Sequence, residues 1–186
     1  SNSIALINND TGENLSYSVS TINDQSFTID PENDLPEFSN MMVILSNIQD
    51  TNGNLLTNDT IQFRTADESP PIISASGLAS TNQYCYIDFS EGVFSSNSGE
   101  GGIELNDLEY TFDPNGGNCN SVNILEIKNY TGAILSGGET LVYAYVQLNS
   151  SPSGSETIIF APADGSSIFD QAGNPMHPSS ITGVMT

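Results

Sequence analysis

Residues 84–89 read Tyr-Cys-Tyr-Ile-Asp-Phe, and this run decides the fold class. Its second, fourth and sixth residues are apolar, while the residues between them carry polar groups. A period of two places the apolar side chains on one face of a β-strand and the polar groups on the other. The same alternation recurs at 61–65 and 141–148. The sequence therefore predicts half-buried strands of antiparallel sheets.

Turn signals separate these runs at intervals of about ten residues. Turns rich in Gly, Pro or Asn are expected at 52–53, 113–117, 137–138 and 151–154. Several short strands at this spacing are typical of an antiparallel sandwich. Residues 103–112 alternate as well as they follow a helical period, so we expect a strand or a short turn there. The predicted fold class is all-β.

An internal repeat indicates two related units. Residues 9–16 resemble residues 129–136, with five of eight positions identical. Residues 48–56 resemble residues 168–176, sharing Ile, Asp, Gly and Asn. Both matches have an offset of 120 residues. Agreement on one offset favours a duplication over a chance similarity.

The repeat predicts an unequal pair of units. The offset leaves the first unit without a counterpart of roughly residues 72–120. We therefore expect a partial sandwich at 1–67, which lacks its N-terminal strands, and a complete sandwich at 72–186. Residues 68–71 end in two prolines. They are the expected linker, because proline fixes φ and favours an extended spacer.

Short motifs spread along the chain carry a family resemblance. Residues 48–54 read Ile-x-Asp-x-x-Gly-Asn, a closing strand follows at 61–65, and an acidic Pro-Pro junction ends the unit. Residues 87–93 and 153–158 look like a second strand and a late strand of the same kind of module. Together these motifs resemble the bacterial immunoglobulin-like (Ig-like) domains, which occur in tandem in large surface and secreted proteins. The resemblance implies Ig-like Greek-key sandwiches with a spacer, adhesive or envelope role, and it implies no catalytic residues.

The charge balance excludes several classes of partner. The 186 residues carry 23 acidic side chains and two basic ones, for a formal net charge of −21. Nucleic-acid binding needs clustered Lys and Arg, and anionic lipid surfaces repel such a chain. No apolar run approaches the roughly 20 residues that cross a bilayer, so we expect no membrane insertion. The abundance of Asn, Ser, Thr, Gly and Asp favours an excerpt of an exported protein, located outside the cell or on its surface.

Calcium is the one cofactor that the sequence suggests. Asp50 and Asn52, and Asp170 and Asn174 in the repeat, offer oxygen ligands at the spacing of calcium loops. The EF-hand pattern then fails, because Leu55 stands where that loop needs Gly. Asp and Asn side chains also cap tight turns through the backbone. Both interpretations, a metal loop and a structural turn, stay open.

The linker carboxylates Asp67 and Glu68 make a second calcium hypothesis. A cation held by one module, the linker and the next module would stiffen the string and relieve self-repulsion. The loop carboxylates that could add oxygen ligands are Glu91, Asp107, Asp113 and Asp164. The alternative is a solvated acidic surface that maintains solubility.

The two cysteines, Cys85 and Cys119, permit one disulfide in an exported chain. Cys85 falls on the apolar face of its strand, whereas Cys119 follows a Gly-rich turn. Two separate, partly buried thiols are therefore the alternative. Their spacing does not match a zinc motif.

The expected function is that of a non-catalytic spacer or adhesion module of a prokaryotic cell-surface or secreted protein. Its partners would be neighbouring Ig-like modules of the same parent chain or of another copy. The chain has no nucleophile or phosphate-loop motif, and the single His177 makes no catalytic triad. We therefore expect no enzyme activity.

Two alternative functions remain from the sequence. The first is an envelope lattice (S-layer-like) or filament subunit, in which upstream sequence or another chain supplies the strands that the first unit lacks. The second is a carbohydrate-binding accessory module of a secreted hydrolase. In that case Tyr84 and Tyr86, on the outward face of one strand, would bind surface glycans.

Overall fold

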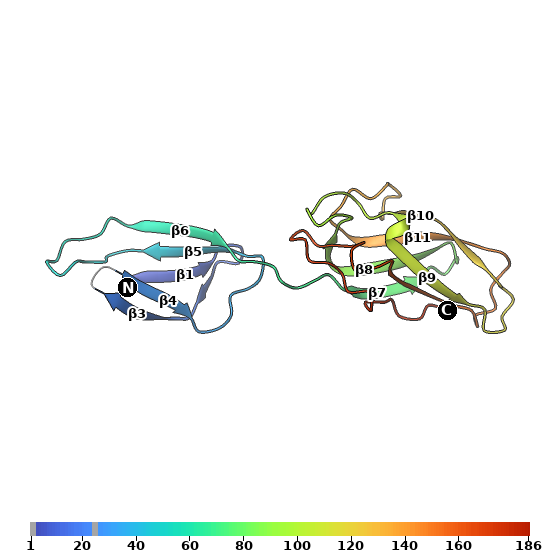
Figure 1. The fold of residues 1–186 in the computed structure, drawn as a ribbon, viewed down its shortest axis with the longest axis horizontal. Coiled ribbons are helices and arrows are strands. Elements are labelled where there is room, and N and C mark those ends of the chain that lie inside the picture. Colours follow the sequence, from blue (N-terminus) through green and yellow to red (C-terminus); the bar gives the residue numbers. More distant parts are fainter. Residues whose placement is uncertain (1–2, 24–25) are drawn as a thin grey trace. The chain divides into compact units, whose positions relative to one another are not determined.

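The structure, a computed structural model, describes residues 3–23 and 26–186 (Figure 1). Its described residues form antiparallel β-sheets with a single turn of 3-10 helix, which confirms the prediction of an all-β sandwich fold. The chain divides into two compact units, Ser1–Asp67 and Glu68–Thr186.

The first unit is built from two sheets. One has the strand order β2-β1-β5-β6, and the other is the hairpin β3-β4. All pairs are antiparallel. The strands described in this unit are β1 (Ile4–Asn8), β2 (Glu13–Leu15), β3 (Tyr17–Asn23), β4 (Ser26–Pro31), β5 (Asn40–Leu45) and β6 (Asp59–Arg64).

The second unit is a two-layer sandwich. One layer has the order β10-β11-β8-β7, and the other pairs β9 with β12. A bridge between Ile158 and Met185 adds the end of the described chain to the second layer. The elements are β7 (Ile73–Leu78), β8 (Tyr84–Val93), the 3-10 turn η1 (Leu105–Asp107), β9 (Leu108–Asp113), β10 (Val122–Lys128), β11 (Glu139–Leu148) and β12 (Thr157–Pro162).

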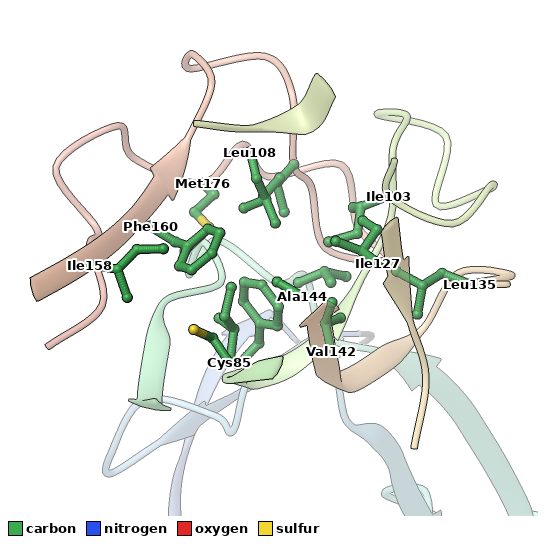
Figure 2. Close-up of a cluster of buried hydrophobic side chains, with 14 of the residues drawn as sticks. Cys85, Ile103, Leu108, Ile127, Leu135, Val142, Ala144, Ile158, Phe160 and Met176 are labelled. Carbon is green, nitrogen blue, oxygen red and sulfur yellow. The ribbon is translucent and has the colours of Figure 1, made fainter. Parts of the chain in front are cut away.

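The core of the second unit lies between these two layers. Figure 2 shows Cys85, Val142 and Ala144 from one layer facing Ile158 and Phe160 from the other. All five side chains are buried, and the alternation at 84–89 places its apolar residues inward as predicted. Burying an aliphatic or aromatic side chain of this size contributes about 1.5–3 kcal/mol. The unit therefore has a core large enough to hold its own fold.

The first unit has a much smaller core. Its buried apolar cluster contains three of the described residues, Leu6, Met41 and Val43, whereas the cluster of the second unit contains sixteen. Ile61 lies opposite Val43 in the β5–β6 register, and Phe63 lies opposite Met41. Opposed residues share one face of a sheet, so both point toward the inside of the unit. They are nevertheless 50% and 40% exposed.

Strand pairing explains why the first core is open. β5 pairs with β1 and β6 in the first unit, as β12 pairs with β9 and the Met185 segment in the second. The hairpin β3-β4 follows β1 in the chain, as β10-β11 follows β9. No strand among the described residues of the first unit corresponds to β7 or β8. The expectation that residues 1–67 form a partial sandwich stays a prediction.

This correspondence corrects one half of the sequence repeat. The offset of 120 residues holds for 48–56 and 168–176, which follow equivalent strands. It does not hold for 9–16 and 129–136, because the first segment follows β1 and the second follows β10. By its pairing, β1 corresponds to β9. The similarity of those two segments reflects a turn type that Asn, Thr and Gly favour wherever it occurs.

Candidate functional site

The repeated Asp-x-x-x-Asn motif forms the same hydrogen-bonded turn in both units. In the first unit the backbone N–H of Asn54 donates to Asp50 Oδ1 at 2.8 Å, and Asn54 Nδ2 donates to Asp50 Oδ2 at 2.7 Å. In the second unit Asn174 makes the same two bonds to Asp170, again at 2.8 and 2.7 Å. The side chain of Asn54 holds the pKa of Asp50 below its usual value.

The geometry of these turns favours the structural interpretation of the motif. Gly53 and Gly173 have φ values of +84° and +91°, a region that glycine enters without a steric penalty. Asn52 contributes its backbone N–H, which donates to Asp50 Oδ1 at 2.9 Å. In both turns the Asp carboxylate therefore accepts internal hydrogen bonds that shape the turn, and calcium binding by these turns stays a prediction.

One of the two turns lies next to another carboxylate. Asp170 is fully buried, and its carboxylate lies within 4.8 Å of the carboxylate of Glu91, at the end of β8. Two hydrogen bonds between Phe94 and Phe169, of 2.8 and 2.9 Å, hold the two segments together. Two carboxylates at this distance repel each other when both are ionised, and a divalent cation removes that repulsion.

The other predicted carboxylates lie in different surroundings. Asp67 is the last residue of the first unit and is half-buried, whereas Glu68 begins the second unit and is exposed. Asp113 accepts the N–H of Asn115 within its own turn. Asp107 and Asp164 also accept bonds from their own loops. Burial raises the pKa of Asp107, and the hydroxyl of Ser167 lowers the pKa of Asp164.

Four tyrosines gather on the outer face of the sheet that contains β8 and β11. Tyr84 and Tyr86 lie opposite Tyr145 and Tyr143, respectively. The ring of Tyr84 meets Tyr143 edge-on, with 5.0 Å between centroids, and lies 5.7 Å from Tyr145. Tyr86 is 36% exposed. Its ring covers Gly77, where an added Cβ would come within 2.5 Å of the ring.

This tyrosine face is larger than the sequence prediction. The sequence predicts Tyr84 and Tyr86 on the outward face, and the structure adds Tyr143 and Tyr145 to them. The alternation at 141–148 places both on the polar side of β11. Only the β8–β11 register brings them next to the predicted pair. Lys128 borders the face, 5.8 Å from the Tyr145 ring, and forms a 2.8 Å ion pair with Glu126.

Both cysteines are free and buried in the structure, so it does not contain the disulfide that the sequence permits. Cys85 lies on the inner face of β8 and points into the core. The thiol of Cys119 donates instead to the carbonyl of Ser121 at 3.3 Å and to Asn149 Oδ1 at 3.2 Å. The two sulfurs are thus held by different surroundings, as in the alternative of separate thiols.

Cys85 also lines a cavity of about 270 Å³ within the second unit. Its other walls are mainly apolar and include Leu78, Phe112, Val146 and Met185. Burial raises the pKa of Cys85 to about 12. A thiol with this pKa stays protonated at neutral pH and is neither a nucleophile nor a good metal ligand.

A buried carboxylate that the sequence did not reveal borders the same cavity. Glu156 is 5% exposed, and it accepts backbone N–H groups of Ser153, Gly154 and Ser155 at 2.9–3.1 Å. It also accepts the N–H of Cys119 at 2.8 Å. The bond from the Cys119 N–H is the largest cause that lowers the pKa of Glu156 to about 2. Bonds from Ser153 lower it further, while burial opposes the shift. Glu156 is therefore ionised at neutral pH, and its carboxylate connects the two loops by hydrogen bonds.

No helix in the described part of the chain has the length and apolar character needed to span a membrane. The chain matches no family model and no curated protein.

Proposed function

We propose that this chain is a non-catalytic spacer and adhesion module of a prokaryotic cell-surface or secreted protein. The observation that carries the proposal is the strand order of the second unit, with β10-β11-β8-β7 facing β9, β12 and the Met185 segment. That order is the one of the constant-type immunoglobulin sandwich. It agrees with the Ig-like motifs in the sequence, and many cell-surface domains share this sandwich architecture.

The division of the chain and its charge fit this role. The second unit has its own core, so it does not depend on its neighbour for stability. The net charge of −21 keeps copies of the chain apart in solution. A module that spaces other domains needs both properties, a shape that persists alone and a surface that does not self-associate.

Pulling the full chain from its two ends tests the spacer function. The second unit comprises 119 residues, so its unfolding should appear as one separate step. At about 3.5 Å per residue the step should lengthen the chain by roughly 400 Å. A gradual extension without that step would contradict a spacer module that keeps its fold under tension. Antibodies to the chain should also label intact source cells, and labelling that requires permeabilised cells would contradict a surface location.

A second candidate function is glycan binding on the tyrosine face. It is favoured by the four clustered rings, since aromatic faces stack on the apolar sides of sugars. Tyr86→Ala should abolish the binding seen on a glycan array. Tyr130→Ala is the matched control, because Tyr130 is 77% exposed and lies in a loop outside the face. Equal binding by the wild type and Tyr86→Ala would contradict this function.

A bound calcium ion is the third part of the proposal. It is supported by the proximity of Glu91 and Asp170, where two carboxylates face each other with one of them fully buried. Burying a negative charge is costly unless a cation or hydrogen bonds compensate for it. Calcium binding by the linker carboxylates Asp67 and Glu68 stays a separate prediction.

A further inference from the structure

A carboxylate that the fold does not use borders the tyrosine face. Asp88 follows Tyr86 by two positions on β8, so the two side chains point to the same side of the sheet. Asp88 is partly exposed, and the hydroxyl of Ser74 donates to its backbone carbonyl at 3.1 Å and not to its carboxylate. None of the described residues donates a hydrogen bond to that carboxylate or pairs with it as a cation. Both of its oxygens are therefore available to accept hydrogen bonds from a ligand.

The ring of Tyr86 lies across the neighbouring strand. Gly77 is the residue opposite Tyr86 in the β7–β8 register. A Cβ added at Gly77 would come within 2.5–2.6 Å of three atoms of the Tyr86 side chain, so this position needs glycine for the close approach. The inner side of the ring thus covers the backbone of β7, and its exposed part points away from the sheet. A ring held in this way is a fixed platform on which the apolar side of a sugar ring can stack.

Tyr86 and Asp88 together match the two kinds of surface that a sugar ring has. Its C–H groups form an apolar side, and its hydroxyl groups lie around its edge. Two positions along a strand are about 6.5 Å apart, so a sugar ring stacked on Tyr86 has its edge next to Asp88. A carboxylate can accept two neighbouring hydroxyl groups at once, and hydrogen bonds to an ionised acceptor are stronger than those to a neutral one.

The charge around the tyrosine face selects uncharged glycans. Residues 68–186 contain thirteen acidic side chains and one basic one, Lys128. The ammonium group of Lys128 is already paired with Glu126 at 2.8 Å. A glycan with carboxylate or sulfate groups is therefore repelled by Asp88 and by the net charge of the unit.

We propose that the tyrosine face binds an uncharged polysaccharide, with one sugar ring stacked on Tyr86 and two neighbouring hydroxyl groups donating to Asp88. Asp88 determines the specificity of this site, because it requires adjacent hydroxyl groups and repels acidic sugars. The inference rests on the glycan-binding function proposed above and names its class of ligand.

An array of polysaccharides tests the class of ligand, with the full chain as the probe. The uncharged polymers are dextran, hydroxyethylcellulose, mannan and xylan, and the acidic ones are carboxymethyl-dextran, carboxymethylcellulose, alginate and polygalacturonate. At least one uncharged polymer should bind, at least about 10-fold more tightly than any acidic polymer, because acidic groups are repelled by Asp88. Equal or tighter binding of an acidic polymer would overturn the proposal.

Two variants locate the hydroxyl contact, with affinity for the best uncharged polymer measured by titration calorimetry. Asp88→Asn keeps the shape of the side chain, removes its charge, and should weaken binding by about 10-fold. Glu109→Gln makes the same change at an exposed position in the other layer, and it should leave the affinity within about 2-fold. Because the Asp88 carboxylate makes no bond within the described fold, Asp88→Asn should melt at the wild-type temperature.

Failure of this inference and failure of glycan binding give different results. If Tyr86→Ala abolishes binding while Asp88→Asn binds as the wild type does, glycans bind to the tyrosine face and the role of Asp88 is overturned. If only acidic polymers bind, the glycan-binding function stands and the uncharged class is overturned. If no polymer of the array binds, both fail.

Discussion

The carboxylate of Glu156 links two loops of the second unit, because its Oε1 accepts a hydrogen bond from the backbone N–H of Cys119 at 2.8 Å. The same carboxylate accepts the N–H groups of the 153–155 turn. A negative group surrounded by amide donors gains stability in the folded state that it does not have in the unfolded chain.

This bond predicts acid sensitivity of the second unit. The folded pKa of Glu156 is about 2, against an ordinary value of 4.5. A lowered folded pKa stabilises the fold above the ordinary value, and the contribution is lost as the pH falls from 4.5 toward 2. The melting temperature should fall by several degrees over this range. Glu156→Gln should already melt lower at neutral pH and lose much of that dependence.

The exposed Glu109, on β9, provides the control for this experiment. Glu109→Gln should keep both the melting temperature and the pH profile of the wild type. A Glu156→Gln variant with the full wild-type pH dependence would show that other carboxylates govern acid unfolding.

The paired turns predict unequal costs for the same substitution. Asn174→Ala removes a donor from Asp170, which is fully buried, so it should destabilise the second unit by about 1–3 kcal/mol. Asn54→Ala removes the same bond from the exposed Asp50, where water replaces it, and should cost less than about 1 kcal/mol. Urea unfolding of the full chain measures both. An equal loss of unfolding free energy in the two variants would mean that burial of the turn does not affect the strength of this hydrogen bond.

Calcium should stabilise the second unit if Glu91 and Asp170 bind it. Addition of calcium should raise the melting temperature by several degrees over that in a chelator, since a ligand at 100 times its Kd contributes about 2.7 kcal/mol. Glu91→Gln should remove this response and raise the melting temperature in the chelator, because the repulsion from Asp170 is gone. Glu100→Gln, at an exposed position, should behave as the wild type. Identical melting curves in calcium and chelator would rule out a structural ion.

Thiol labelling decides between the disulfide and the free cysteines. Cys85 and Cys119 are both buried, and the pKa of Cys85 is about 12. An alkylating reagent at pH near 8 should therefore add no label to the folded chain and two labels in strong denaturant, as read from the intact mass. A denatured, unreduced chain without label would demonstrate a disulfide.

The sequence predicts where the strands lie and which face of each is apolar. It does not predict which segments pack against those faces. Alternation at 84–89 identified a core strand because its period is a local property. The same rule placed Ile61 and Phe63 on one face, which is right, yet both remain exposed. Cover of such a face comes from strands distant in sequence, as β8 does in the second unit, and a local pattern does not report which strands lie across the core. Residues 103–112, expected as a strand or short turn, contain η1 followed by all of β9 except its last residue.

The contacts of the candidate site residues could likewise not be predicted from the sequence. Asp170 was named from a repeat, but its approach to Glu91 joins segments 79 positions apart in the chain. Tyr143 joined the tyrosine face only through the β8–β11 register. Glu156 gave no signal, because its burial requires two loops to meet. Periodicity reveals which face a residue occupies, whereas partners across the sandwich are set by the topology.

The exposed Asp50–Asn54 turn makes the same hydrogen bonds as the Asp170–Asn174 turn, in which Asp170 is buried. Its shape therefore comes from its own few residues and not from the strands around it. A turn of this kind tolerates either environment, because its hydrogen bonds and its positive-φ glycine lie within five residues. One motif can therefore serve at an exposed and at a buried position of the same chain.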